Sequence, residues 1–476
     1  MSDAYVRTQM LSAQEPPIGE RGVVKWLREN LFSGPLNTIL TILGLAFIFW
    51  ILKLSLPWWL NSVWNAESLG ECRDLVAAAG GESGACWAVI KARWHQYIFG
   101  FYPQDAYWRP VLAFGLMFVA LAPVLYWNDR KGAILVGVAG LLTMLSMVLL
   151  KTPGSVDLIA ILVMAGLFAV AWAVPKKLVY VTLLYPFIAF FLLWGGPIWK
   201  PVATLLGFAV IVIVYRLLQS RFGVVVATAA GVVAAALYWL FFQGAVSGAL
   251  TSILSIGLPA VSSDQFGGFL LAFIIGVTAI SCSLPIGVLL ALGRRSDMFL
   301  IKTLSVGFIE FVRGVPLITL LFTASLLLQY FLPPQTNFDL ILRVIILVTL
   351  FSAAYLAEVI RGGLAALPRG QYEAADALGL DYWQAQRLIV MPQALKISIP
   401  GIVSTFIGLF KDTTLVSFVG LLDPLRGVTQ IVRADINWKG IYWEPYIFVG
   451  VIFFLICFGM SRYSMYLERK LKTDHR

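Results

Sequence analysis

The sequence predicts an all-α protein that crosses a membrane about twelve times. Of its 476 residues, 60% are hydrophobic and only 13% are charged, whereas a soluble domain normally carries about 25% charged residues. Apolar runs of roughly 20 residues, the length that a helix needs to cross a bilayer, recur along the whole chain. These observations exclude a soluble globular protein.

The net charge of +10 does not indicate a nucleic-acid partner. Lys and Arg stand mainly in short connectors between apolar runs, where they orient membrane segments. No basic stripe with interleaved aromatic residues appears outside these runs. The sequence therefore predicts contact with membrane lipid and no binding of nucleic acid.

The first 35 residues are polar and contain Arg7, Arg21, Lys25 and Arg28, and the apolar run that follows is long enough to span a membrane. This pattern is typical of a cytoplasmic segment (1–35) before a retained first helix, and not of a cleavable signal peptide. With the N-terminus in the cytoplasm, most Lys and Arg fall on the cytoplasmic side, and an even number of spans leaves a cytoplasmic tail at 465–476. We expect spans at 36–58, 110–127, 132–150, 156–174, 178–195, 201–216, 222–242, 267–293, 314–332, 339–359, 399–420 and 444–462.

The four cysteines fall into two groups. Cys72 and Cys86 lie in the largest external segment, 61–109, and are candidates for a disulfide in an oxidising compartment; two free thiols are the alternative. Cys282 and Cys457 lie inside predicted spans and are interpreted as small buried apolar residues.

The chain divides into two parts by its chemistry. The spans of residues 36–245 are mostly Leu, Val and Ala with few charges, and we interpret them as a membrane extension of about seven helices. An external linker, 246–266, leads to a core at 267–464 that holds nearly all the unusual residues, with the join near 262–267. No internal repeat relates the two parts.

The cytoplasmic loop 360–398 is predicted to contain two short helices. Residues 371–378 form helix readily, Gly379 suits the left-handed position after a helix, and Asp381 with Gln384 fits a capping box. The second helix should stop at Pro392. Gly362-Gly363 and Pro368-Arg369-Gly370 should break the helix that precedes the loop, with an ordinary loop as the alternative.

One face of the first loop helix carries small residues. Ala374 and Ala375 lie on the same side as Leu378, which fits a thin edge entering a groove on a partner. An amphipathic loop lying on the membrane surface is an equal alternative on these residues alone.

A family resemblance bears on this choice. Glu373-Ala374-Ala375, then Gly379, then Ile389-Val390-Met391-Pro392 resembles the EAA signature of ABC-importer permeases, with Met391 where the family usually has Leu. In that family the element is a coupling helix that docks in a cleft of the cytoplasmic ATP-binding subunit. The resemblance implies a coupling role for Glu373, Ala374, Ala375, Asp376, Leu378 and Gly379.

The resemblance extends from about Gly267 to Ser464 through FVRGVPLI, AAYLAEVIRGG, FKDTTLV and GLLDPL. These motifs are similar to the polar amino-acid uptake subfamily, and the long N-terminal part resembles the long subunit of general L-amino-acid or glutamate/glutamine/aspartate/asparagine permeases. The chain departs from the subfamily at Leu320, where a polar residue is common.

The resemblance implies a five-helix type I importer core in a bacterial inner membrane. It also implies these partners: a dimer of ABC ATP-binding subunits that uses ATP and Mg²⁺, a second homologous permease subunit forming a heterodimer, and a periplasmic amino-acid-binding protein.

Charged residues within or beside spans are costly and are therefore candidates for function. Lys411, Asp412 and Thr413 stand in a polar interruption of a span, where a helix can open around a substrate; a structural ion-pair network is the alternative. Glu358 with Arg361, and Glu310 with Arg313, are spaced for pairing on one helix face. The resemblance places Glu358, Arg361 and Arg313 near a cytoplasmic gate, whereas interfacial snorkelling is the alternative for the arginines.

The sequence contains no GxxxxGK[ST] phosphate loop. We therefore expect no ATP site and no cofactor on this chain. His95 and His475 are the only histidines, which gives no basis for a metal site, and no hydrolase constellation appears.

The predicted function is that of a permease subunit, and not an enzyme, in an ATP-driven importer of polar L-amino acids. An ion- or proton-coupled secondary transporter and a non-transporting membrane scaffold are the alternatives. The first usually shows internal repeats; the second would make the seven-span extension the functional part.

Overall fold

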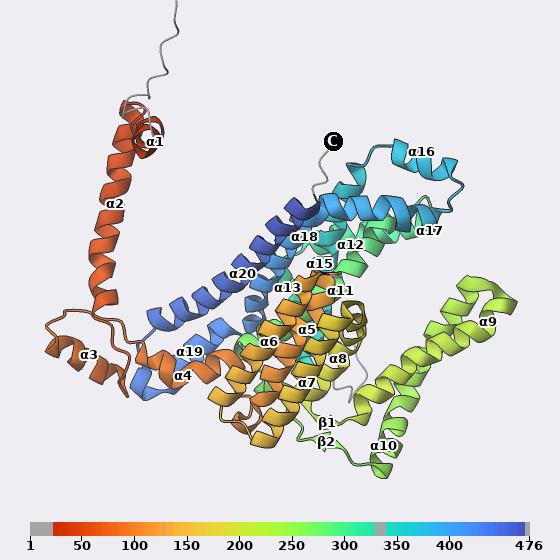
Figure 1. Ribbon diagram of the computed structural model, residues 1–476, viewed down its shortest axis with the longest axis horizontal. Coiled ribbons are helices and arrows are strands. Elements are labelled where there is room, and N and C mark those ends of the chain that lie inside the picture. The colour runs from red at the N-terminus through yellow and green to blue at the C-terminus, as the bar shows by residue number, and fades with distance from the viewer. Residues whose placement is uncertain (1–21, 128, 328–329, 331–338, 472–476) are drawn as a thin grey trace, which may run out of the picture. The chain divides into compact units, whose positions relative to one another are not determined.

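The computed structural model describes residues 22–127, 129–327, 330 and 339–471. These residues are almost entirely helical (Figure 1). Among them, the strands are two residues long: β1 (Gly196–Pro197) pairs antiparallel with β2 (Gly257–Leu258), and Gly196 lies opposite Leu258. The all-α prediction is confirmed.

The number of membrane-spanning helices also agrees with the sequence. Within the described ranges, eleven helices are long and apolar enough to cross a membrane, and a bent pair would make twelve. The eleven are Pro35–Leu60, Gln104–Leu125, Arg130–Leu149, Gly154–Ala173, Pro175–Trp194, Trp199–Val224, Val226–Ile253, Gly268–Arg294, Leu340–Ala365, Tyr382–Val419 and Trp443–Leu471.

The chain forms two compact units. Unit 1 comprises residues 1–92 and 435–444, and unit 2 comprises residues 93–434 and 445–476. Within unit 2, one hydrophobic core runs from Phe99 to Leu421, and the Phe114 ring of the extension lies 4.8 Å from that of Phe273 in the core. The part of the extension between Phe99 and Leu193 therefore shares a hydrophobic core with helices that follow much later in the sequence.

Unit 1 is held by contacts between segments distant in sequence. Its elements are α1 (Gly22–Asn30), α2 (Pro35–Leu60), α3 (Leu69–Ala78), the start of α4 (Ala88–Phe99) and η9 (Ile436–Trp438). Cys72 and Cys86 form a disulfide with their Cα atoms 5.9 Å apart, as predicted. The Cys86 amide donates a hydrogen bond to Glu444 Oε1 at 2.8 Å, and Glu444 is buried.

Removing this disulfide should destabilise unit 1. The two cysteines are 14 residues apart in sequence, and closing a loop of this size stabilises a fold by about 3 kcal/mol. We expect the double variant Cys72→Ser/Cys86→Ser to unfold at a lower temperature in detergent and to be insensitive to reductant. The matched control is Cys282→Ser/Cys457→Ser, which leaves the disulfide intact. An unchanged melting temperature in the first variant, with and without reductant, would contradict the prediction.

The free cysteines differ from the prediction that both are buried. Cys282 is exposed on the surface of the chain and Cys457 is half-buried. Their positions in the sequence show only that they belong to apolar helices, whereas burial depends on whether another helix covers that face.

Unit 2 is built around α11 (Gly268–Arg294), α15 (Leu340–Ala365) and α18 (Met391–Asp412). A Cβ on Gly287 of α11 would lie 2.8 Å from Leu356 Cβ of α15, and one on Gly363 of α15 would lie 2.5 Å from the Ala394 carbonyl oxygen of α18. Glycine thus permits the close approach of these helices. α15 continues past Gly362 and Gly363 and ends at Ala365, so the predicted break falls just before Pro368 and not at the two glycines.

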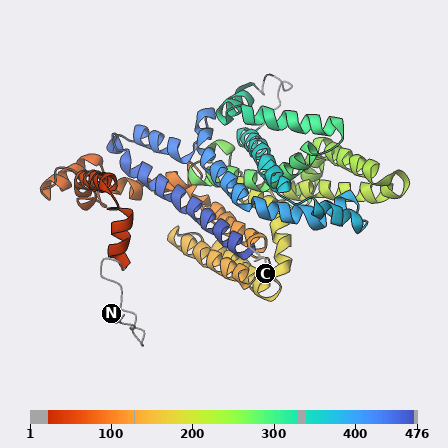
Figure 2. The same cartoon turned by 90° about the horizontal axis from the view of Figure 1, so that it is seen from above.

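The other elements of unit 2 surround these three helices. Figure 2 shows α20 running beside α5 to α7, and the Tyr463 hydroxyl of α20 donates to the Leu125 carbonyl of α5. The remaining bounds are α5 (Trp108–Leu125), α6 (Arg130–Leu149), α7 (Gly154–Ala173), α8 (Val179–Trp194), α9 (Trp199–Leu237), α10 (Gln243–Ile253), α12 (Phe299–Gly314), α13 (Leu317–Phe322), α16 (Gly370–Ala377), α17 (Tyr382–Ala385), α19 (Pro424–Ala434) and α20 (Trp443–Leu471).

The span expected at 314–332 begins at a sharp bend. α12 and the helical segment Leu317–Leu327 meet at an angle of 103°, and residues 328–329 and 331–332 of that prediction lie outside the described residues. The break falls at Val315-Pro316, where the ring of Pro316 is incompatible with continuing the α12 hydrogen bonds.

The helix after Gly379 does not stop at Pro392. A π-helical turn, Gln386–Val390, leads into α18, whose first residues include Pro392. Proline is tolerated in a first helical turn, where its missing N–H needs no helical partner.

The hairpin of α9 and α10 refines two further predictions. The predicted spans 201–216 and 222–242 are separated at Gly223, whose φ of 78° is not helical. Helix continues through a π turn, Tyr238–Phe242, and then α10 to Ile253. The first residues of the predicted 246–266 linker are therefore helical.

Candidate functional site

The predicted loop between α15 and α18 contains the two short helices α16 and α17 (Figure 1). Gly379 joins them with φ of +69°, a left-handed conformation that glycine adopts without steric cost. Asp381 Oδ1 accepts the Gln384 amide at 2.8 Å, and Gln384 Oε1 accepts the Asp381 amide at 3.1 Å. The predicted bend and capping box are confirmed, and both arise from local backbone chemistry.

The exposed edge of α16 is narrower than the sequence suggested. Leu378, just after α16, is 72% exposed and Ala374 is exposed, but Ala375 is only 1% exposed because α16 packs against the π turn before α18. Glu373 and Asp376 are also exposed. The edge available to a partner therefore consists of Ala374 and Leu378 with acidic neighbours, while Ala375 holds α16 against the bundle.

Contacts missed by the sequence reasoning join α16 to the ends of the core helices. Arg295 Nη1, after α11, donates to the Tyr372 hydroxyl at 3.0 Å and to the Leu364 carbonyl at 3.2 Å. Gln393 Nε2 of α18 donates to Gln371 Oε1 at 2.9 Å. A displacement of α16 would therefore be felt by α11 and α18. The sequence shows that Arg295 is a charged residue at the end of a span, but it does not show which residue Arg295 contacts.

A charged cluster lies at the same end of unit 2. The Glu358 cluster consists of Arg294, Glu310, Arg313, Glu358 and Arg361. The Glu358 carboxylate lies 2.9 Å from Arg294, 3.0 Å from Arg361 and 3.7 Å from Arg313. The Glu358 side chain is 15% exposed, so a single shielded carboxylate holds guanidinium groups from α11, α12 and α15.

The pairings agree only in part with the spacing rule. Glu358 and Arg361 pair on α15 as their spacing permits. Glu310 instead lies 2.7 Å from Arg294, and Arg313 turns to Glu358. Arg294 was missed because its partners belong to other helices. With three arginines and two glutamates, the cluster carries an excess positive charge.

The polar interruption after α18 changes the helix type. The α-helix ends at Asp412, and Thr413–Val419 forms a 3₁₀ segment. Lys411 is exposed and Asp412 is half-buried, with no ion pair between them in the described part of the chain. Thr413 is fully buried, and its hydroxyl donates to the Phe410 carbonyl at 2.7 Å. A role of these residues in the transport pathway stays a prediction.

Two buried hydroxyls of α15 were also missed. Thr349 Oγ1 and Ser352 Oγ are buried and have no hydrogen-bond partner among the described residues. They are three residues apart and so share one helix face. Unpaired hydroxyls in an apolar core are costly, and this cost is a physical reason to include them with the candidates for the pathway.

Asp423 caps α19 and is 1% exposed. Its carboxylate accepts the amides of Leu425 and Arg426 at 3.0 and 2.9 Å. Burial nevertheless raises the pKa of Asp423 from 3.8 to about 6, against the opposing effect of these hydrogen bonds. The charged form is therefore disfavoured in the fold.

This raised pKa predicts a pH dependence of stability. The folded state holds the Asp423 proton more tightly than the unfolded chain does. The contribution of this proton to the free energy of unfolding is therefore fully present below pH about 3.8 and is lost as pH rises through about 6. The loss is on the order of 3 kcal/mol. We expect the melting temperature of the wild type to fall over this window relative to that of Asp423→Asn, which does not titrate. Parallel curves for the two proteins would contradict the assignment.

Comparison with known proteins identifies the family of the chain. Residues 283–473 match the family model of the binding-protein-dependent transport system inner membrane component. The chain is 61% identical to the glutamate/glutamine/aspartate/asparagine transport system permease protein BztC of Rhodobacter capsulatus, over 100% of both chains. It is 36% identical to the inner membrane amino-acid ABC transporter permease protein YhdY of Escherichia coli, over 94% of this chain and 93% of that protein.

A crystal structure of an amino acid ABC transporter with histidines is 30% identical, covers 42% of this chain and 91% of that chain, and has a TM-score of 0.38. The full-length sequence relatives are sufficient for assignment. The chain therefore belongs to the family of polar amino-acid ABC transporter permeases.

Proposed function

We propose that this chain is the transmembrane permease subunit of an ATP-driven importer for polar L-amino acids, coupled through α16 to a separate ATPase. The observation that carries the proposal is the exposed Ala374–Leu378 edge of a helix whose other face is tied to α11 and α18. A partner bound at this edge could displace α16, and the contacts on the other face of α16 would transmit the displacement to the bundle. The sequence has no phosphate loop of its own, which supports an external source of ATP hydrolysis.

The assembly that we propose follows from family membership. Two ABC ATP-binding subunits bind ATP and Mg²⁺, a second homologous permease forms a heterodimer with this chain, and a periplasmic amino-acid-binding protein delivers substrate. Both termini lie in the cytoplasm, and the multi-pass chain resides in a bacterial inner membrane. Because BztC is named for glutamate, glutamine, aspartate and asparagine, we propose substrates of this acidic and amide class.

The Glu358 cluster and the polar segment Lys411–Thr413 are our candidates for the gate and the pathway. The cluster joins the ends of three helices that must separate if a cytoplasmic exit opens between them. The surplus positive charge of the cluster would attract an acidic substrate leaving through that exit. Opening can be driven only by contacts that differ between the two states, and the α16 edge provides such contacts.

Purification in mild detergent followed by reconstitution tests the proposal. We expect an ATPase and a second permease to co-purify with the chain. In liposomes with the binding protein, L-glutamate or L-glutamine should stimulate ATP hydrolysis, whereas apolar amino acids should not. Uptake driven by a proton or ion gradient through the chain alone, with no ATPase requirement, would overturn the proposal in favour of a secondary transporter.

A further inference from the structure

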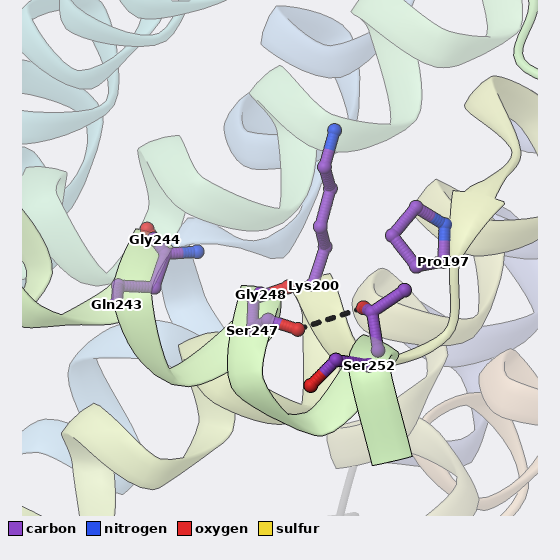
Figure 3. A pocket seen from close by; sticks show the side chains of 8 residues that line it. Pro197, Lys200, Gln243, Gly244, Ser247, Gly248 and Ser252 are labelled. Carbon is purple, nitrogen blue, oxygen red and sulfur yellow. Dashed lines mark hydrogen bonds between the residues drawn. The ribbon is translucent and has the colours of Figure 1, made fainter. Parts of the chain in front are cut away.

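A pocket lies between the start of α9 and α10, within unit 2, and has no part in the proposed coupling. Its volume is about 610 Å³. Figure 3 shows its lining, which consists of Pro197, Lys200, Gln243, Gly244, Ser247, Gly248, Thr251 and Ser252. No atom lies within 4 Å of where a Cβ on Gly244 or Gly248 would be, so the two glycines leave this side of α10 open.

The walls of the pocket are held in place by contacts outside it. Pro197 pairs with Gly257 across β1 and β2, and Trp199 Nε1 donates to the Leu254 carbonyl at 2.7 Å. Both contacts join the chain at the start of α9 to the chain after α10. The pocket is therefore a built feature of the hairpin and not a chance gap between two independent helices.

The polar groups of α10 present mainly hydrogen-bond acceptors. Thr251 donates its hydroxyl to the Ser247 carbonyl and Ser252 donates to the Ala249 carbonyl, both at 2.7 Å. The Gln243 amide nitrogen donates to Thr204 Oγ1 at 2.9 Å. The hydroxyl protons of Thr251 and Ser252 are therefore in use. Their oxygens, the Ser247 hydroxyl oxygen and the Gln243 carbonyl oxygen can accept, while Gln243 keeps a second N–H and the Ser247 hydroxyl keeps its proton. A ligand group with several N–H donors, such as a primary ammonium, matches this face.

Lys200 supplies the opposite chemistry. Its side chain is exposed, and no carboxylate in the described part of the chain forms an ion pair with it. In Figure 3 its extended side chain carries the ammonium away from the hydroxyls of Ser247 and Ser252. One end of the pocket therefore suits an anion and the other a cationic amine, so the complementary ligand is a zwitterion.

The surroundings of the pocket are apolar and exposed. Leu240 is 75% exposed, Phe241 70% and Ile253 81%, and all three belong to a helix long and apolar enough to cross a membrane. Exposed side chains of this kind face acyl chains in a bilayer. A ligand that brings its own acyl chains would cover them, whereas a free amino acid would not.

We propose that this pocket binds the headgroup of an aminophospholipid, phosphatidylethanolamine. The phosphate lies against the Lys200 ammonium, and the primary amine donates to the acceptor oxygens of Ser247, Thr251 and Gln243. The acyl chains run along the exposed apolar faces of the hairpin. The site thus lies in the hairpin of α9 and α10, separate from the proposed coupling and gate residues.

Three phospholipids whose headgroups differ in charge and in N–H donors test the proposal. Phosphatidylcholine carries the same charges, but its quaternary amine has no N–H to donate, and phosphatidylglycerol has no cation. The complex purified with its subunits is placed in nanodiscs that contain equal amounts of the three lipids, and retained lipid is measured by native mass spectrometry after delipidation. We expect phosphatidylethanolamine to be retained roughly tenfold over phosphatidylcholine, as the loss of one or two charge-assisted hydrogen bonds implies.

Variants assign the retained lipid to the pocket. Lys200→Ala should reduce retention of phosphatidylethanolamine about tenfold, and Ser247→Leu, which fills the cavity, should abolish the preference. The matched control is Lys151→Ala, an exposed lysine on the same predicted side of the membrane. Equal retention of the three lipids, equal effects of the two lysine variants, or displacement of the lipid by millimolar L-glutamate would each overturn the proposal.

Discussion

Replacing Gly379 by valine is expected to abolish substrate-stimulated ATP hydrolysis by the assembled transporter while the permease still inserts into the membrane. Gly379 has φ of +69° and nothing lies within 4 Å of where its Cβ would be. The substitution therefore causes no clash; it strains the backbone, because a β-branched residue rarely adopts the left-handed region. The strain is relieved by changing φ, which turns α16 relative to α17.

The size of this effect can be graded at the same position. A left-handed conformation costs an ordinary L-residue roughly 1–2 kcal/mol, whereas asparagine tolerates it better. Coupled hydrolysis should therefore decrease from Gly379→Asn through Gly379→Ala to Gly379→Val. ATPase assays in proteoliposomes measure coupling, and the membrane fraction measures insertion. Wild-type coupling in the valine variant would refute the role of α16.

Replacing Glu358 by alanine is expected to have the second-largest effect, because this carboxylate is shared by three arginines. Its removal leaves the guanidinium groups of Arg294, Arg313 and Arg361 close together without their common anion. Removing one partner from a shielded ion pair costs about 3 kcal/mol. We expect uptake to fall by at least tenfold and ATP hydrolysis without substrate to rise, because the ends of α11, α12 and α15 are no longer held together.

Glu310→Ala is the matched control for this experiment. Its side chain is 53% exposed and pairs with Arg294, and an exposed pair contributes only about 0.2–1 kcal/mol. Uptake and basal ATP hydrolysis should therefore stay near wild type in Glu310→Ala. The same modest effect in both variants would show that the Glu358 carboxylate does not hold the ends of α11, α12 and α15 together.

Gly379 and Glu358 each connect several helices through a single group, so a change at either position should have a large effect. Gly379 connects two helices through a single backbone conformation, so one φ change redirects the whole coupling element. Glu358 connects three helices through one side chain, and conservative change to glutamine would keep its shape while removing its charge. The buried Ala375 and the Arg295–Tyr372 contact lie between these two points, which gives a continuous physical route from α16 to the ends of α11 and α15.

Much of the loop between α15 and α18 was predictable because it is determined by local backbone chemistry. The bend at Gly379 and the capping box of Asp381 and Gln384 depend on residues only a few positions apart. The burial of Ala375 beside exposed Ala374 was not predictable, since helical period shows which residues share a face but not which neighbour covers it. For the same reason the sequence does not show that Gly363 lies where α15 meets α18.

The sequence by itself determined the all-α membrane class, the approximate number of spans and the two short helices of the loop between α15 and α18, and it made Cys72 and Cys86 candidates for a disulfide. These follow from bilayer thickness, residue composition and short-range hydrogen bonding. Only the tertiary structure decided that Arg294 joins Glu358, that the extension shares the core of the permease, and that Lys200 stands across a pocket from the hydroxyls of α10. These features depend on contacts between helices far apart in the chain, and a contact of that kind is decided by how whole faces pack together.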